Sequence, residues 1–291
     1  MLLHISMSKY LSYSFKDFLP SFSLQYIKGP NSNLRFDYQR NINLPNTMQL
    51  QEVVDNSNIL NIRKGNSGLK QELIDKFNLT YTNFDAATLK NVVIYLDGSL
   101  ATNGITNATT INYTNDTIVV DNFKLGPGAR FMKLVNIDGN LNIYSYLNYS
   151  FPIKSTKSNI NSTTFINFRR DINLINNVKG NTDNYTIGET LRYTLNLQEK
   201  IDLNFSSSST YNIARFPFLS NENRSYFVQQ FTLESTYSTK KGWTIENYFN
   251  YLFNKGQSAA YNQPVVLLNA NVSKQIFKKK KVNLSYQFMI Y

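Results

Sequence analysis

The chain has 291 residues, with 30 Lys and Arg against 19 Asp and Glu, no Cys and a single His, His4. Without Cys there is neither a disulfide framework nor a thiolate metal site, and one His gives little basis for a Ser-His-Asp triad or a His-rich metal site. We therefore expect no catalytic residue, no metal ligand and no cofactor, and a protein that is not an enzyme.

The net charge of +11 does not indicate a nucleic-acid partner. Basic residues fall at predicted turns, as in the run Lys278 to Lys281, and such positions are usually the solvated ends of strands. No stretch of about 18 apolar residues predicts a transmembrane helix. The first residues, MLLHISMSKYLSYSF, do not form a signal peptide. Residues 1–14 are expected to be a poorly defined N-terminal remnant, and residues 15–291 to form one β domain.

Alternation with a period of two residues runs through most of the chain and predicts strands. We expect twelve of them, most about 10 to 16 residues long, whereas soluble strands average 5 or 6 and a tilted membrane strand needs about 9 to 11. The predicted strands are 15–28, 34–43, 71–84, 89–103, 131–151, 157–170, 185–198, 201–216, 223–238, 243–254, 264–277 and 281–291.

The two faces of these strands differ in character, as the segment from Leu141 to Phe151 illustrates. One face carries Leu141, Ile143, Leu147, Tyr149 and Phe151, and the other carries Asn142, Tyr144, Tyr146, Asn148 and Ser150. The first set suits lipid and the second a wet lumen. Tyr144 and Tyr146 are therefore expected to face inward, and Arg169, Arg170 and Arg192 to line the lumen, where they would favour an anion.

The connections alternate between short turns and the longer links 44–70, 104–130, 171–184, 217–222 and 255–263. This parity is typical of outer-membrane barrels, with short periplasmic turns and long outer loops. The pattern predicts an all-β fold: an antiparallel up-and-down transmembrane β-barrel portion of about twelve long strands, forming an open, incomplete barrel. The directions of the first and last predicted strands, relative to the periplasmic turns, predict an odd number of strands before the chain and at least one after it.

The link 44–70 carries an ordered motif. Its residues are Pro45, Gln49, Leu50, Gln51, Val53, Asp55, Asn58, Leu60, Gly65, Asn66, Leu69, Lys70 and Glu72. They match the pattern P-x-x-x-Q-L-Q-x-V-x-D-x-x-N-P-L-x-x-x-x-G-N-P-x-L-K-P-E, except that Ile59, Ser67 and Gln71 replace its later prolines. The motif resembles a signature of outer-membrane β-barrels of the TonB-dependent receptor type, especially those of Bacteroidetes-like bacteria.

The resemblance implies a C-terminal barrel portion without the N-terminal plug. Such receptors have 22 strands and import glycans or iron chelates with energy from an inner-membrane protein that reaches them through the plug. The implied partners are outer-membrane lipid and the barrel assembly machinery, and the chain alone is not expected to transport. We interpret the motif as a structural loop with positive φ at Gly65 and Gly68, and a ligand-facing loop is the alternative.

Two other hypotheses stay open. One is a non-transporting outer-membrane scaffold or adhesin, and the other is a soluble surface β-sandwich or solenoid with a dry core between stacked sheets. The segments GPGAR (126–130) and KGN (64–66) do not match phosphate-binding loops and are predicted to be turns.

Overall fold

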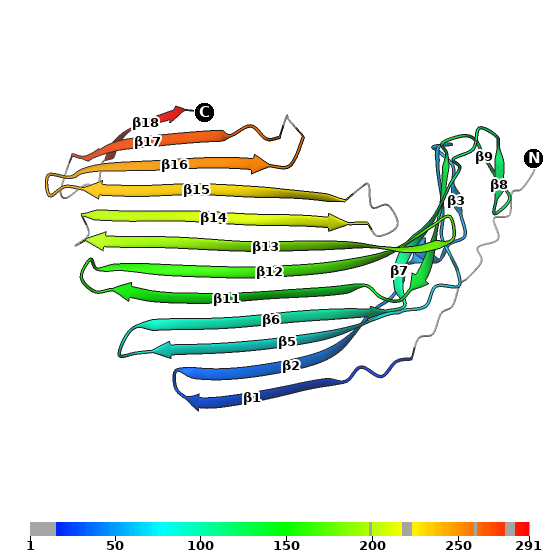
Figure 1. Ribbon diagram of the computed structural model, residues 1–291, viewed down its shortest axis with the longest axis horizontal. Helices are drawn as coiled ribbons and strands as arrows, with labels where there is room; N and C mark the ends of the chain where they lie inside the picture. Colours follow the sequence, from blue (N-terminus) through cyan, green and yellow to red (C-terminus); the bar gives the residue numbers. More distant parts are fainter. Residues whose placement is uncertain (1–15, 198–199, 217–222, 259–260, 277–282, 291) are drawn as a thin grey trace, which may run out of the picture.

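The computed structural model describes residues 16–197, 200–216, 223–258, 261–276 and 283–290. Twelve strands lie side by side in one layer, each antiparallel to the next (Figure 1). They are β1 (Ser21–Gly29), β2 (Ser32–Asn43), β5 (Glu72–Asp85), β6 (Lys90–Thr102), β11 (Leu141–Ile153), β12 (Ser158–Ile175), β13 (Val178–Leu197), β14 (Ile201–Arg215), β15 (Arg224–Ser238), β16 (Trp243–Lys255), β17 (Val265–Gln275) and β18 (Asn283–Ile290).

The expected fold class is confirmed. The strands follow chain order across the sheet, with β1 and β18 at its two edges. Among the described strands these two edges pair with nothing further, so the sheet is open. The only helix in the described ranges is α1 (Thr47–Leu50), and none there is long and apolar enough to cross a membrane.

One face of the sheet is apolar and exposed. Leu147 on β11 is 45% exposed, Ile166 on β12 50% and Ile187 on β13 47%. Strand register places these side chains on the same face, which we call the apolar face. The buried apolar residues among those described all lie outside the middle of this sheet: Leu50, Ile62, Leu69, Leu125, Ala129, Phe131 and Ile172. The dry core that a soluble sandwich requires is therefore missing from the twelve strands.

The opposite face, which we call the polar face, carries hydrogen bonds between the amide, hydroxyl and carboxylate side chains of neighbouring strands. Asn148 Nδ2 donates to Thr163 Oγ1 at 2.7 Å, and Asn204 Nδ2 donates to Glu234 Oε2 at 2.9 Å. Tyr146 also lies on this face and stacks on Tyr95, with ring centroids 5.2 Å apart. The alternation predicted from the sequence thus separates the two faces correctly.

A glycine in the middle of β13 accommodates an aromatic ring from β12. Gly188 pairs with Phe165 on the polar face, and a Cβ at Gly188 would lie 2.3 Å from Phe165 Cε1. The ring thus occupies the space that any side chain at position 188 would need. This arrangement fixes the register between the two longest strands.

The predicted link 171–184 is wrong. The strands β12 and β13 continue through it and close at Asn176 and Asn177, whose φ angles are 48° and 63°. Two consecutive residues with positive φ form the tight hairpin turn that matches strand twist, and Asn tolerates that conformation. The neighbouring residues Leu174 and Ile175 pair in parallel with another strand, β7 (Gly104–Ile111), which supports the extended hairpin.

The predicted strand 131–151 is also wrong, because it is two strands. It divides into β10 (Arg130–Ile137) and β11, with Gly139 at φ 116° between them. β10 leaves the twelve-stranded path and pairs with β7 instead. The first predicted strand, 15–28, begins later than expected, at Ser21. Residues 1–14 with His4, the link 217–222 and the run Lys278 to Lys281 lie outside the described residues.

Replacing Gly188 by Ala should destabilise the sheet, because the new methyl group would overlap the Phe165 ring. We expect the free energy of unfolding to fall by about 1 to 3 kcal/mol. Denaturant unfolding of the protein extracted from membranes measures the change. The matched control is Gly98→Ala on β6, where the nearest atom to an added Cβ is 4.0 Å away. Equal stability of the two variants would contradict the packing role of Gly188.

Candidate functional site: an outer-loop subdomain

A small second unit lies at the end of the sheet opposite the turns that join β1 to β2 and β5 to β6, at the right of Figure 1. It consists of residues 44–71 and 104–137, and we call it the outer-loop subdomain. These segments hold α1, β3 (Val54–Asp55), β4 (Asn61–Lys64), β7, β8 (Ile118–Val120), β9 (Phe123–Leu125) and β10. The two segments expected as the longest outer loops, 44–70 and 104–130, therefore contain short strands and the helix α1, connected by turns and irregular backbone.

Strand pairing joins the two segments across a long stretch of sequence. β10 pairs in parallel with β4, and antiparallel with β7. β3 then pairs with β4 at the margin of this unit. Each segment has antiparallel pairing of its own, β3 with β4 and β8 with β9, and the parallel pairing of β4 with β10 joins the two segments.

The subdomain has its own apolar core. Ile62, Leu125, Ala129 and Phe131 are all buried, and the ring of Phe123 stacks on Phe131 with centroids 6.0 Å apart. Ala129 belongs to the segment GPGAR, which is a turn as predicted, with Gly128 at φ 72°. The outer loops thus carry the buried core that the twelve strands lack.

Asn112 is a polar centre of this unit that sequence reasoning missed. It is 1% exposed, and its Nδ2 donates to the backbone oxygens of Asp116 and Leu125 at 2.8 and 2.9 Å. Its Oδ1 accepts from the backbone N–H and hydroxyl of Thr114. The sequence signal available was Asn followed two residues later by Thr, a common turn pattern, but the chain has many Asn residues.

The motif residues that are apolar or glycine are mostly inside. Pro45 and Gly65 are buried, Leu50 is 7% exposed and Leu69 is 3% exposed. A Cβ at Gly65 would lie 2.1 Å from the backbone oxygen of Gln51. Gly65 is therefore required by close backbone approach.

The expected positive φ at Gly65 and Gly68 is wrong, since neither residue adopts it. Glycine is nevertheless required at position 65, for a reason other than the one expected. The physical reason is contact with another part of the loop, which a turn pattern does not show.

The polar motif residues form turns and ties to β10. Asn46 and Gln49 cap α1 reciprocally, and the Asn66 N–H donates to Gln49 O at 2.7 Å. Asn66 Nδ2 reaches Leu134 O on β10 at 2.8 Å, and the Lys70 N–H donates to Asn136 Oδ1 at 2.7 Å. These bonds anchor the loop 44–70 on β10, as a structural motif would.

Two further motif residues act locally. Asp55 Oδ1 accepts from the backbone N–H and the hydroxyl of Ser57, and Asn58 Oδ1 accepts from the Leu60 N–H at 3.0 Å. The Ser57 hydroxyl holds the pKa of Asp55 below its usual range. Both residues are exposed and shape the turn that leads into β4.

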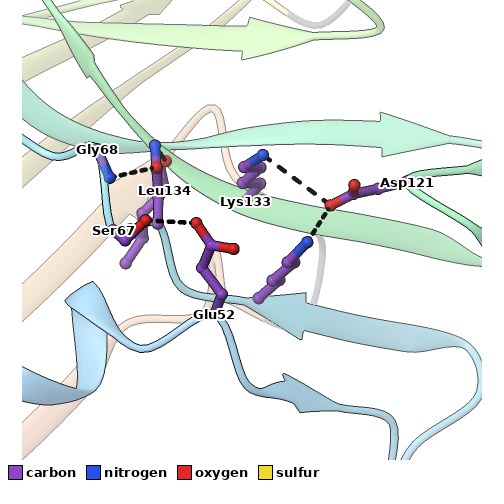
Figure 2. A network of polar contacts seen from close by, with 8 residues as sticks. Glu52, Ser67, Gly68, Asp121, Lys133 and Leu134 are labelled. Atoms are coloured by element: carbon purple, nitrogen blue, oxygen red, sulfur yellow. Dashed lines mark hydrogen bonds and ion pairs between the residues drawn. The ribbon is translucent and has the colours of Figure 1, made fainter. Parts of the chain in front are cut away.

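Charged groups clamp the hairpin of β8 and β9 to the rest of the subdomain (Figure 2). Lys64 Nζ lies 2.8 Å from Asp121 Oδ2, and Lys133 Nζ lies 4.0 Å from the same oxygen. The Lys64 ammonium lowers the pKa of Asp121, and Asp121 in turn raises the pKa of Lys64. Nearby, the Ser67 hydroxyl donates to Glu52 Oε1 at 2.5 Å and lowers the pKa of Glu52.

An open cavity of about 450 Å³ adjoins this network. Its lining includes Gln49, Gln51, Asp55, Arg63, Lys64 and Met132. Amides and charges of both signs offer hydrogen bonds to a polar ligand at the outer end of the sheet. Across the described ranges, no three His, Cys, Asp or Glu side chains gather as a metal site would require.

The arginines expected to line the lumen do not share one face. Arg169 and Arg170 are consecutive on β12 and so project to opposite faces. Arg170 Nε lies 2.7 Å from Asp183 Oδ1 on the apolar face, so its expected place in the lumen is wrong. Arg192 pairs in register with Asn161 on the polar face, as expected, and Tyr144 and Tyr146 lie on that face too.

A single-layer sheet with one apolar and one polar face, turns at one end and structured loops at the other, defines the wall of a membrane β-barrel. Residues 5–214 match the model of the outer membrane protein beta-barrel family. The match covers more than half of the chain, so the chain belongs to that family and is a β-barrel protein of the outer membrane. No curated protein and no solved structure matches the chain.

Replacing Gly65 by Ala should detach the loop 44–70 from β10, because the added methyl group would overlap backbone at Gln49 and Gln51. We expect at least a tenfold faster cleavage of this loop by an added protease on whole cells, with the sheet itself intact. The control is Gly68→Ala, where the nearest atom is the flexible Asn66 side chain at 3.2 Å. Similar cleavage of both variants would refute the role of Gly65.

The clamp at Asp121 should depend on pH. Because its pKa is lowered in the folded protein, the stabilisation is complete above the ordinary value of 3.8 and is lost as pH falls through the lower, folded value. Pepsin cleavage near residues 118–125 should therefore rise below about pH 3.8. The Asp121→Asn variant lacks the titrating carboxyl group and therefore controls for the pH dependence of pepsin itself. It should be cleaved faster than the wild type above about pH 3.8, and at a similar rate once the pH is below the lowered pKa of Asp121. A constant ratio across the range would contradict the clamp.

Proposed function

We propose that this chain is the C-terminal barrel portion of a TonB-dependent receptor that imports a bulky nutrient, a glycan or an iron chelate. The observation that carries the proposal is the motif from Pro45 to Glu72. Within the motif, Asn66 hydrogen-bonds to the backbone of β10, and Gly65 packs directly against the backbone of Gln51. Few other residues could replace either of them without breaking these contacts. Because these matching positions have a structural role in the subdomain, the match supports a relationship between this chain and receptors that carry the same pattern.

The open sheet supports the same proposal. The outer backbone groups of β1 and β18 have no further strand beside them among the described residues. In a bilayer each unsatisfied backbone group costs several kcal/mol, so an open edge in hydrocarbon is strongly disfavoured. Further strands of a larger receptor barrel would cover both edges. The twelve strands would then form the part of a 22-stranded barrel near its C-terminal end.

The polar face suits the passage of a hydrated ligand. Tyr95, Tyr144 and Tyr146 form a cluster of rings on this face, and Asn148 and Asn161 exchange hydrogen bonds beside it. Aromatic faces stack on sugar rings, and amides supply hydrogen bonds to hydroxyl groups. The energised step would need a plug and an inner-membrane energy-coupling protein, so the described sheet would supply the wall and the outer loops, without catalysing any reaction.

The native protein isolated from outer membranes tests this proposal. Its mass and N-terminal sequence should reveal a polypeptide much heavier than the 33.6 kDa of this chain, with a plug domain ahead of the barrel. Cells without the energy-coupling protein should lose uptake of the nutrient that the receptor binds. Deletion of the receptor gene is the matched control and should cause the same loss.

A closed barrel of 33.6 kDa with β1 paired to β18 would overturn the receptor proposal. So would uptake that is unchanged by deleting either gene. The non-transporting scaffold or adhesin would then be the better interpretation.

A further inference from the structure

The apolar face is interrupted by a compact group of polar side chains on four adjacent strands. It consists of Ser162 and Thr164 on β12, Glu189 on β13, Ser207 and Ser209 on β14, and Gln229 on β15, and we call it the mid-face polar patch. Register places four of them in one row, where Thr164 pairs with Glu189, Glu189 with Ser209, and Ser209 with Gln229.

The patch is hydrogen-bonded within itself. The Ser162 hydroxyl donates to Glu189 Oε1 at 2.6 Å, and the Thr164 hydroxyl donates to Glu189 Oε2. The Ser209 hydroxyl donates to Gln229 Oε1, and Gln229 Nε2 donates to Ser207 Oγ at 3.0 Å. These bonds hold a carboxyl, a carboxamide and four hydroxyl groups together at fixed positions.

The surroundings show that the patch lies at mid-depth in the lipid-facing belt. Ile187 and Leu191, two residues either side of Glu189 on the same face, are 47% and 49% exposed. Tyr185 and Tyr193 follow at four residues either side, each about 13 Å along the strand. Aromatic residues mark the two margins of a lipid-facing belt about 25 Å tall, so Glu189 is central in it.

A carboxyl group in the middle of a bilayer is costly and usually has a functional reason. Internal bonds reduce that cost, but each carboxyl oxygen of Glu189 accepts a single bond in the patch and retains further acceptor capacity. A neighbouring protein that covers the patch and donates hydrogen bonds to Glu189 would lower the remaining energetic cost of placing this carboxyl group in lipid. Between apolar surfaces in lipid there is no hydrophobic driving force, so polar groups of this kind determine where membrane proteins meet.

We propose that the mid-face polar patch is the contact through which two copies of this protein associate side by side in the outer membrane. A two-fold contact sets the same surface against itself, so that surface must be self-complementary. The patch meets this requirement because it holds the acceptor Glu189 next to Ser207 on the neighbouring strand, whose hydroxyl accepts from Gln229 and keeps its own proton to donate. Its width of four strands, about 15 Å between the outer two, suits the narrow contact between two cylinders.

Cross-linking in native outer membranes tests the proposal, and the chain offers a clean background because it has no Cys. Leu191→Cys introduces one thiol at the centre of the patch, between Ser162 and Ser207 in register, without removing a polar member. Ile94→Cys is the matched control, since Ile94 lies in the same row as Glu189 and on the same face, but on β6. A short bis-maleimide should give a dimer of two receptor chains with the first variant and none with the second.

Glu189→Leu, combined with Leu191→Cys, tests whether the patch itself drives the contact. Loss of the carboxyl group should reduce the dimer yield about fivefold, whereas Glu189→Gln should retain most of it. Heat-dependent gel mobility reports whether each variant is folded in the membrane. If Glu189→Leu does not fold, the comparison of Leu191→Cys with Ile94→Cys still decides.

Equal dimer yields for Leu191→Cys and Ile94→Cys would overturn the proposal. Cross-links from Leu191→Cys to a different protein alone, or a dimer yield unaffected in folded Glu189→Leu, would overturn it as well. None of these outcomes depends on nutrient uptake, so failure here is distinct from failure of the receptor proposal.

Discussion

The structure depends on satisfying backbone hydrogen bonds within a single layer. Twelve strands pair edge to edge, and no second sheet covers either face of them in the described residues. Side chains such as Leu147 and Ile166 consequently remain about half exposed. In water this apolar face would be a severe aggregation hazard, whereas in a bilayer the hydrocarbon supplies the missing layer. Strand length, alternation and the exposed apolar face all follow from this constraint.

The outer-loop subdomain follows a different rule because it lies beyond the hydrocarbon. There the chain must bury its own apolar groups, and it does so with a small core around Leu125 and Phe131. Irregular backbone between the strands is satisfied by the amides of Asn66, Asn112 and Asn136. One chain therefore contains two solutions to the same problem, one that uses lipid and one that uses buried side chains.

Charged and polar groups on the apolar face are distributed by depth. The ion pairs Arg40 with Asp75 and Arg170 with Asp183 lie near the outer ends of their strands, in register with one another through β6 and β11. They lie next to aromatic rings such as Phe168, at the level where lipid meets water. Glu189 has no such position, because it lies midway between the aromatic margins. At this depth Glu189 cannot reach the lipid headgroups, so contact with a neighbouring protein explains a carboxyl group on the apolar face better than contact with the membrane surface does.

The amino-acid sequence by itself determined most of the twelve strands and their two faces, because alternation with a period of two is a local property of each segment. It also predicted the open sheet, from the alternation of short and long connections. In addition, it singled out the loop motif, in which Gly65 was expected for a positive φ that the structure does not have. Only the tertiary structure decided that β10 departs from β11, that residues 171–184 continue two strands, and that β4 lies beside β10. Those features rest on pairing between residues up to about 70 positions apart, such as Asn61 and Arg130. The free energy of such pairing belongs to both partners together, so neither segment alone encodes it.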